Sequence, residues 1–399
     1  MKPAKKTHLF FIENEGVLFS EPMQKLFHLN TVAAFVWCML EEGKGQSSIL
    51  TDLQTTFSLS QSDATLYLEQ ANELFQSLGV LRGFEPIINR EQESETAPVK
   101  NITYDGECFF AEHHYRLLNS NIRMRFSHPS QLDAIAPILS HLEVDGPFKP
   151  TVTLDIVQDS SADIFLCRNQ TPVLSCKRVV QLAPLAKSLV WQTAINDHHF
   201  FLDIHAGVVS DGTCCYLFPA SPGSGKSTLT ATLVYHGFEY FSDEVALLHE
   251  DNLLVQPVPL ATCVKDTGIE VLARYYPKLK KLDQHHRSDG KHVRYLAPEK
   301  ESLPPPDTLR PVGAIIFPCH KPDQQTALTP LAPIEALQLL MQECLIVDTH
   351  LDRNKVSGLL DWILKTPCYR LTVSDLQTAV DIIKTLSNES SQKANQSSN

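Results

Sequence analysis

The chain has 399 residues, of which 43% are hydrophobic and 20% charged, and its formal net charge is −12. This length allows two or three domains, and the negative charge argues against broad binding to nucleic acid or to anionic membranes. The longest apolar run, Val32 to Leu40, is too short to span a membrane, and Glu13 and Glu15 precede it, so the N-terminus makes a poor signal peptide.

The ten cysteines contain no C-x-x-C pair, and most lie in apolar stretches. We therefore expect buried, reduced thiols in a cytoplasmic protein. A zinc site is the alternative, but no Cys/His spacing supports it. For the same reason we expect the paired histidines, His113-His114 and His198-His199, to be surface residues.

Residues 1–87 are predicted to form a small winged helix-turn-helix. Two extended stretches, HLFFIEN and VLFS, flank the turn signal Glu15-Gly16, and a third lies at KLFHL. Three helices are expected to follow, with Asn30 capping the first, Ser60 capping the third and Gly79 ending it. Apolar residues recur at helical spacing in each of the three.

A winged helix usually suggests DNA binding, but the charges do not fit that function. Residues 1–90 hold seven Lys or Arg against ten Asp or Glu, and the third helix contains no basic residue. The basic surface typical of DNA-binding proteins is therefore missing.

The stretch HLNTVAAFVWCML, followed by a helix ending in LFQSLGVL, resembles PqqD-like domains over about 80 residues. The resemblance implies recognition of the leader segment of a ribosomally made peptide, which is added as a β-strand to the edge of the domain. The alternative is a structural cap on the larger domain.

After this domain the sequence predicts a linker, a large domain and a tail. Residues 88–100 are polar and acidic and are expected to be the linker. Residues 101–388 are expected to form one mixed α/β domain, which opens with strands at TVTLDIV and ADIFLCRN and helices at QLDAIAPILSHL and AKSLVWQTAI. Residues 389–399 are predicted to be a disordered tail.

The strongest chemical signal is CCYLFPASPGSGKSTLTATLVYHG. A strand-like run, Cys214–Phe218, enters a glycine-rich loop, and a helix-like run then extends to Gly237. Glycines let backbone N–H groups approach phosphate oxygens, Lys226 would reach the β- and γ-phosphates, and Ser227 would hold Mg²⁺. Ala220 stands where the common pattern has its first glycine. The predicted nucleotide-binding residues are Ser221, Pro222, Gly223, Ser224, Gly225, Lys226, Ser227 and Thr228.

Chain lengths place two more polar residues beside this loop. The helix from Ser227 to His236 rises about 15 Å, and a strand returning to Ser242 covers about 16 Å, so Asp243 should lie level with Lys226. Upstream, the turn at 210–212 allows a hairpin that would bring His205 to the same sheet edge. A purely structural histidine is the alternative for His205.

These motifs resemble the HPr kinase/phosphorylase family, particularly its HPr-kinase-related members. The matching stretch, DIHAGVVSDGTCCYLFPASPGSGKSTLTATLVYHGFEYFSDEVALL, lies within a resemblance over residues 101–388. It implies an HPr-kinase-like P-loop kinase domain that uses ATP and Mg²⁺, with Asp243, His205 and Lys226 catalytic and with Ser227 and Glu244 holding the metal. The pair Asp243-Glu244 stands where the family commonly has two aspartates.

A further departure lies downstream, where LATCVKDTGIEVL replaces the family signature. The resemblance therefore does not extend to HPr itself or to the reverse phosphorylase reaction. Lys265, Lys291 and Arg294 are candidates for contacts to phosphate or substrate, with solvated surface charges as the alternative.

The sequence thus predicts an α/β kinase preceded by a PqqD-like winged helix. It would phosphorylate Ser or Thr in a peptide, with no nucleic-acid or membrane partner, and a homo-oligomer is compatible with it. One alternative is a nucleotide-gated, peptide-binding chaperone with little catalysis. Another is a kinase for a small metabolite.

Overall fold

The computed structural model describes residues 2–84, 99–104, 109–221, 223–305, 307–347 and 350–397, without the side chains of 344–347 and 390–397. Most of the linker predicted at 88–100 lies outside these ranges. The chain divides into two compact units. The first contains Met1–Thr96, Ala332–Leu339 and His350–Lys365, and the second contains Ala97–Leu331, Leu340–Thr349 and Thr366–Asn399.

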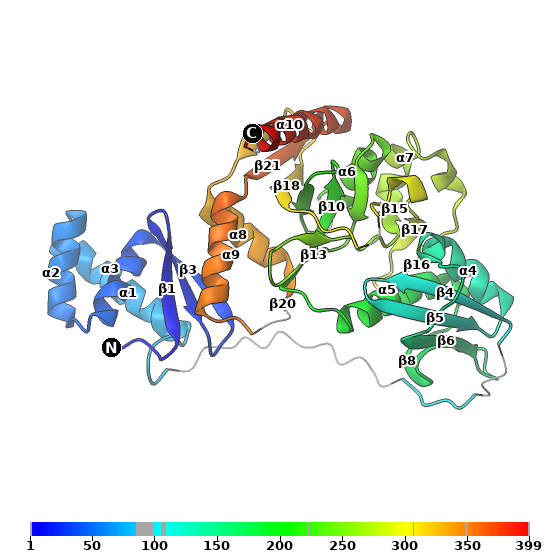
Figure 1. Cartoon of the computed structure of the whole chain (residues 1–399). Coiled ribbons are helices and arrows are strands. Elements are labelled where there is room, and N and C mark those ends of the chain that lie inside the picture. Colours follow the sequence, from blue (N-terminus) through cyan, green and yellow to red (C-terminus); the bar gives the residue numbers. More distant parts are fainter. Residues whose placement is uncertain are drawn as a thin grey trace. The chain divides into compact units, whose positions relative to one another are not determined.

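The first unit opens with an antiparallel sheet of three strands and continues into three helices, drawn in blue in Figure 1. The strands are β1 (Thr7–Ile12), β2 (Glu15–Ser20) and β3 (Lys25–Leu29), and the helices are α1 (Thr31–Glu41), α2 (Gln46–Phe57) and α3 (Gln61–Ser77). As predicted, Asn30 and Ser60 accept hydrogen bonds from the first turns of α1 and α3. Trp37 and Phe75 meet edge to face in the core of this unit.

A distant part of the chain belongs to this first unit. Helix α9 (Arg353–Lys365) packs against β1 and buries one apolar face. The amide of Gln24 exchanges two hydrogen bonds with the backbone of Leu351, at 2.7 and 2.9 Å. Residues 350–365 lie within the range 101–388 predicted for the large domain, whereas their contacts group them with the N-terminal unit.

The second unit is a mixed α/β structure, as expected. Its largest sheet has the order β12-β10-β11-β18-β21-β19. These strands are β10 (Ala206–Ser210), β11 (Cys215–Pro219), β12 (Glu239–Ser242), β18 (Val312–His320), β19 (Ala327–Pro330) and β21 (Cys368–Val373). Strand β11 is parallel to β18 and antiparallel to β10, so the sheet contains both kinds of pairing.

Two smaller sheets lie beside the candidate site. One has the order β14-β13-β9-β20, from β9 (Leu202–Ile204), β13 (Ala246–Leu248), β14 (Val255–Gln256) and β20 (Cys344–Val347). The other has the order β15-β17-β16, from β15 (Thr262–Lys265), β16 (His285–His286) and β17 (His292–Leu296).

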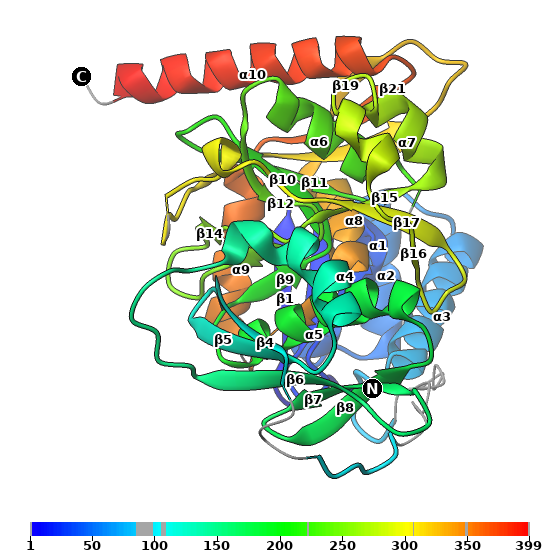
Figure 2. The ribbon, with the colours of Figure 1, turned by 90° about the vertical axis from the view of Figure 1, so that its right-hand side faces the viewer.

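The helices of the second unit cover its sheets. They are α4 (Pro129–Leu139), α5 (Leu182–Asn196), α6 (Lys226–Tyr235), α7 (Asp266–Leu272) and α10 (Leu376–Ser397), and α8 (Pro333–Glu343) is divided between the units. Short 3-10 turns occupy Ser140–Leu142, Val179–Gln181, Pro277–Lys281 and Lys300–Ser302. Helix α10 contacts α6, β19 and β21 (Figure 2). It continues to Ser397, into the segment predicted to be a disordered tail, where Glu, Gln, Lys and Ala all permit a helix.

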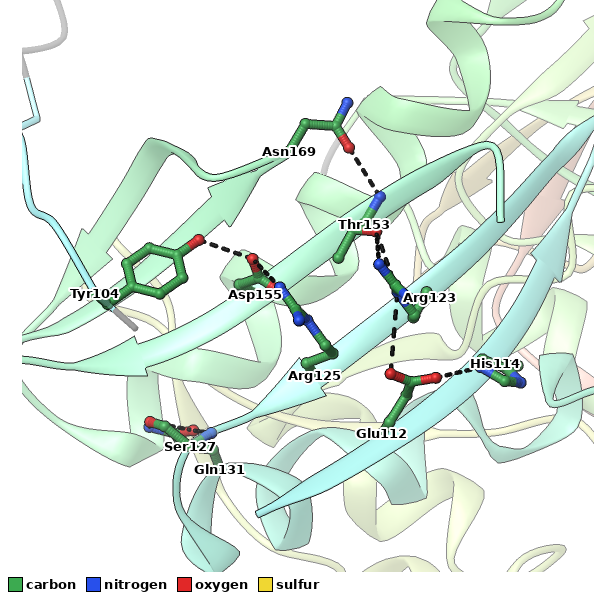
Figure 3. Close-up of polar contacts among 10 residues, drawn as sticks. All are labelled: Tyr104, Glu112, His114, Arg123, Arg125, Ser127, Gln131, Thr153, Asp155 and Asn169. Carbon is green, nitrogen blue, oxygen red and sulfur yellow. Dashed lines mark hydrogen bonds and ion pairs between the residues drawn. The ribbon is translucent and has the colours of Figure 1, made fainter. Parts of the chain in front are cut away.

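A five-stranded sheet, β4-β5-β6-β7-β8, carries the first part of this unit. Its strands are β4 (Ala111–Leu117), β5 (Ser120–Phe126), β6 (Val152–Gln158), β7 (Ile164–Arg168) and β8 (Thr171–Cys176). Along β5 the apolar residues point into the core, while Arg123 and Arg125 alternate onto the polar face in Figure 3. There Arg125 forms a two-pronged ion pair with Asp155, which also accepts a hydrogen bond from Tyr104.

Several expectations about side chains can be compared with this fold. The eight cysteines with described surroundings are free thiols, but of these only Cys167, Cys176, Cys215 and Cys368 are buried as predicted, and the others are partly exposed. His113 and His114 pair with surface glutamates. His198 is a correction, because it is buried against His249 and near Asn119 rather than exposed. No helix in the described ranges is long and apolar enough to cross a membrane.

Candidate functional site

The candidate site is built around the turn between β11 and α6. Every residue of β11 is buried, and the chain leaves this strand through Ala220 into the glycine-rich loop. Gly223 and Gly225 have φ angles of 98° and 90°, a region that favours glycine. Gly225 is the N-cap of α6, so the helix begins at Lys226, one residue before the predicted start at Ser227. Pro222 lies outside the described residues.

Strand β10 approaches α6 very closely. A Cβ atom on Gly207 would lie 2.2 Å from Thr230 Oγ1 and 3.2 Å from Lys226 Cγ. Glycine therefore lets the strand pack directly against the first turns of the helix. This packing places the end of β10 that carries His205 beside Lys226.

Lys226 and His205 are in direct contact. Their Nζ and Nε2 atoms are 2.6 Å apart, as the expected hairpin between β10 and β11 requires. Burial lowers the pKa of His205, and the positive charge of Lys226 lowers it further. Burial also lowers the pKa of Lys226. A neutral imidazole therefore accepts a hydrogen bond from the lysine.

Asp243 returns to the same place at the end of β12, as the length argument predicts. The residue is 7% exposed, and its Oδ1 atom has no hydrogen-bond partner among the described residues. Burial raises the pKa of Asp243 to about 6, although the charge of Lys226 and a hydrogen bond from Ser227 oppose that shift. An acid with such a pKa changes protonation state near neutral pH, as a proton acceptor in catalysis must.

Glu244 makes an ion pair that the sequence did not indicate. Its carboxylate accepts a hydrogen bond from Nζ of Lys187, on helix α5. The positive charge of Lys187 is the main reason why the pKa of Glu244 is lowered. The predicted metal ligand thus has a protein partner in this structure, and its role in metal binding stays a prediction.

Two more carboxyl groups belong to the site, and neither was among the site residues predicted from the sequence. Asp203, on β9, is 1% exposed, and burial raises its pKa to about 7, with the charge of Glu244 adding to the effect. Glu343, at the end of α8, accepts a hydrogen bond of 2.7 Å from Ser221. Asp203 lies two residues before His205 in the apolar run FFLDIHAGVV, and an acidic residue in such a run is a sequence signal of a buried carboxyl group. No comparable signal in the sequence near Glu343 indicates its role.

Of the remaining residues predicted to contact nucleotide or substrate, some lie at the candidate site and others do not. The hydroxyl of Ser224 is buried without a partner among the described atoms, and Thr228 lies against Gly268 of α7. The charge of Lys265 acts on Lys226, which brings Lys265 to this site. By contrast, Lys291 pairs with Asp289 on the surface, and the Arg294 Nε is buried without a hydrogen-bond partner among the described residues.

The residues fit a nucleotide with Mg²⁺ better than a dedicated metal centre. The described ranges contain no group of three or more His, Cys, Asp or Glu residues that could hold a metal. Mg²⁺ bound to a nucleotide needs few protein ligands, because phosphates and water complete its shell. The Ser227 hydroxyl, which donates a hydrogen bond to the neighbouring Asp243 carboxyl, suits that requirement.

Comparisons with known proteins give little further guidance. No family model matches the chain, and no curated protein matches it either. Among solved structures, "TbiB1 in Complex with the TbiA(beta) Leader Peptide" is similar at 24% sequence identity and a TM-score of 0.20. That match covers 21% of this chain and 99% of the other. A likeness of this strength says nothing of what this chain does.

Proposed function

We propose that this chain is an ATP-dependent phosphotransferase that transfers the γ-phosphoryl group to a Ser or Thr hydroxyl of a peptide. The observation that carries the proposal is the meeting of Lys226, His205 and Asp243 at the N-terminal end of α6, directly after a loop with two left-handed glycines. A helix N-terminus with free N–H groups and a lysine suits phosphates. A buried carboxyl group with a pKa near neutrality suits proton transfer.

Each side chain has a role in this reaction. ATP with Mg²⁺ would supply the phosphoryl group. Asp243 accepts the proton of the acceptor hydroxyl, while Lys226 and the loop N–H groups stabilise negative charge on the group in transfer. Ser227, with help from Glu244, would hold the metal. His205 accepts a hydrogen bond from Lys226 before the nucleotide binds and so keeps the lysine at the loop.

The N-terminal unit supports a peptide as the acceptor. In its sheet β2 is central, and one edge of β3 pairs with no other strand in the described ranges. An extended peptide can add to such an edge through backbone hydrogen bonds. We propose that the leader segment of a ribosomally made precursor binds there, in the cytoplasm.

The test is a phosphoryl-transfer assay with γ-labelled ATP, Mg²⁺ and a library of peptides containing Ser and Thr. Asp243→Asn should keep ATP affinity while lowering transfer by about 10²-fold or more. In the wild-type chain the rate should rise with pH and level off above about pH 6, because Asp243 must be deprotonated to accept a proton.

Asp251→Asn is the matched control, because this aspartate is exposed and distant in sequence from the loop. It should leave transfer unchanged. ATP binding without transfer to any peptide would favour a nucleotide-gated binding protein instead. An Asp243→Asn variant with full activity would show that another group is the base.

A further inference from the structure

A cavity adjoins the candidate site and has no role in the reaction proposed above. It measures about 300 Å³, at the lower end of the range for small-molecule sites. It lies among α5, β15, β16 and β17, which Figure 2 shows close together and of which α5 contacts β16 directly. Its lining includes Lys187, Trp191, Glu244, Cys263, Arg287 and Tyr295. We call it the α5 pocket.

Glu244 connects the α5 pocket with the phosphate loop. On the pocket side it forms its ion pair with Lys187. On the other side its charge acts on His205 and Lys226, and Asp243 precedes it in the chain. A group bound in the pocket would therefore lie next to the residues proposed to carry out phosphoryl transfer.

The charges of the α5 pocket favour an anion. The charge of Lys187 is matched by Glu244, and burial lowers the pKa of His286, which favours the neutral imidazole. Arg287 is paired with Asp289, but Lys291 shares the same carboxylate, so this cluster keeps one positive charge in excess. The Arg287 Nε lies 3.3 Å from Asp289 and its Nη1 lies 3.8 Å from the Cys263 sulfur, while its Nη2 makes no hydrogen bond within the described ranges. A guanidinium with a free N–H group can bind a carboxylate.

The walls of the pocket suit a peptide segment. Trp191 is partly buried, Tyr295 is buried, and the Lys187 ammonium lies 5.5 Å from the centre of the Tyr295 ring. Hydroxyl groups of Ser175, Ser188 and Ser288 line the same cavity. Aromatic and hydroxyl side chains together can pack on a short chain and bind its polar groups.

We propose that the α5 pocket is the acceptor subsite and that it selects a hydroxyl residue flanked by an acidic side chain, which Arg287 binds. This inference rests on the proposed phosphotransferase function. The acceptor oxygen attacks the γ-phosphorus, the bond from that phosphorus to ADP breaks, and the hydroxyl proton passes to Asp243. Arg287 takes no part in the bond changes and acts in specificity alone.

Binding is tested on the full chain without ATP, by quenching of tryptophan fluorescence. The probes are two blocked peptides, acetyl-Glu-Ser-Glu-amide and its neutral counterpart acetyl-Gln-Ser-Gln-amide. The acidic peptide should bind about tenfold more tightly, the scale of one hydrogen bond to a charged group. Trp191→Phe should remove the quenching and so assigns the signal to the pocket.

Arg287→Gln should abolish the tenfold preference, and Arg287→Lys should restore part of it. Lys280→Gln is the matched control, because it removes an exposed positive charge that pairs with Glu270 outside the pocket. It should retain the preference. Equal binding of the two peptides, a preference that survives Arg287→Gln, or an equal loss in the control would overturn the proposal.

The transfer assay separates this inference from the function on which it rests. Phosphorylation that is indifferent to the flanking charges would retain the phosphotransferase and overturn the subsite. A pocket that prefers the acidic peptide, in a chain that phosphorylates neither peptide nor any library member, would overturn both the phosphotransferase and the acceptor role of the pocket.

Discussion

Two regions of the second unit bury carboxylates in opposite ways. On the five-stranded sheet Asp155 is fully buried, but Arg125 binds both of its oxygens and Tyr104 donates a third hydrogen bond (Figure 3). Beside the glycine-rich loop Asp203 and Asp243 are also buried, yet one oxygen of each has no partner in the described part of the chain. Burying a charge is costly unless it is paired.

This difference in pairing distinguishes a carboxylate that stabilises the fold from carboxyl groups that are typical of a functional site. At Asp155 the desolvated charge is compensated, and that network orders the face of a sheet. At Asp203 and Asp243 burial raises the pKa values to about 7 and about 6, and the cost remains in the folded state. Such uncompensated groups are typical of sites in which a ligand or a proton completes the arrangement.

The largest expected effect tests the compensated region. Asp155→Asn should destabilise the chain by about 3–5 kcal/mol, because it removes the carboxylate that binds the largely buried Arg125 guanidinium at two points. Glu112→Gln, on the same face, removes a half-exposed carboxylate and should cost less than about 1 kcal/mol. Denaturant unfolding measures both. Similar losses in the two variants would mean that the Asp155 network is no stronger than a surface pair.

The next effect concerns the loop itself. Lys226→Met should weaken ATP binding by about 10²-fold, because it removes a charge-assisted hydrogen bond to phosphate. Calorimetric titration with ATP and Mg²⁺ measures the affinity, and Lys280→Met serves as the control at an exposed site. Unchanged affinity in Lys226→Met would contradict the assignment of the nucleotide site.

A smaller effect is expected where β10 packs on α6. Gly207→Ala places a methyl group into Thr230 and should cost about 1–3 kcal/mol through overpacking. It should also displace Lys226 and weaken ATP binding. Gly358→Ala is the control, because nothing lies within 4 Å of its added Cβ, and in helix α9 it should stabilise by about 0.5–1 kcal/mol. Thermal unfolding and ATP titration together distinguish the two variants.

The smallest effect at neutral pH tests the uncompensated region. Asp203→Asn should leave stability at pH 7 unchanged or slightly raised, because it removes a buried, partly unpaired acid. The folded chain holds this proton up to about pH 7, whereas the unfolded chain releases it near pH 3.8. Between these values the folded state binds more protons, so the contribution of Asp203 to stability is present below pH 3.8 and is lost as the pH rises to about 7.

The variant should therefore flatten that part of the pH profile of unfolding. Denaturation curves at several pH values would measure it. If Asp203→Asn lost as much stability as Asp155→Asn, both carboxylates would be compensated by partners in the folded state. The contrast between the two regions would then be wrong.

Features that depend on near neighbours in the chain can be predicted from the amino-acid sequence alone. Asn30 and Ser60 are caps because a polar side chain can reach the backbone three residues on. The glycine loop is recognised because positive φ angles at Gly223 and Gly225 suit no other residue as well. Asp243 was placed because one helix and one strand of known rise separate it from Lys226.

Contacts between segments that are far apart in the chain could not be predicted in this way. Lys187 meets Glu244 across 57 residues, and Ser221 meets Glu343 across 122. Helix α9 joins the N-terminal unit through Gln24 and Leu351, which are 327 residues apart. Periodicity and spacing describe which face of an element is apolar, but not which distant element covers it. That choice depends on how all the elements pack together, and so the partners of Glu244 and the environment of Asp203 emerged only from the fold.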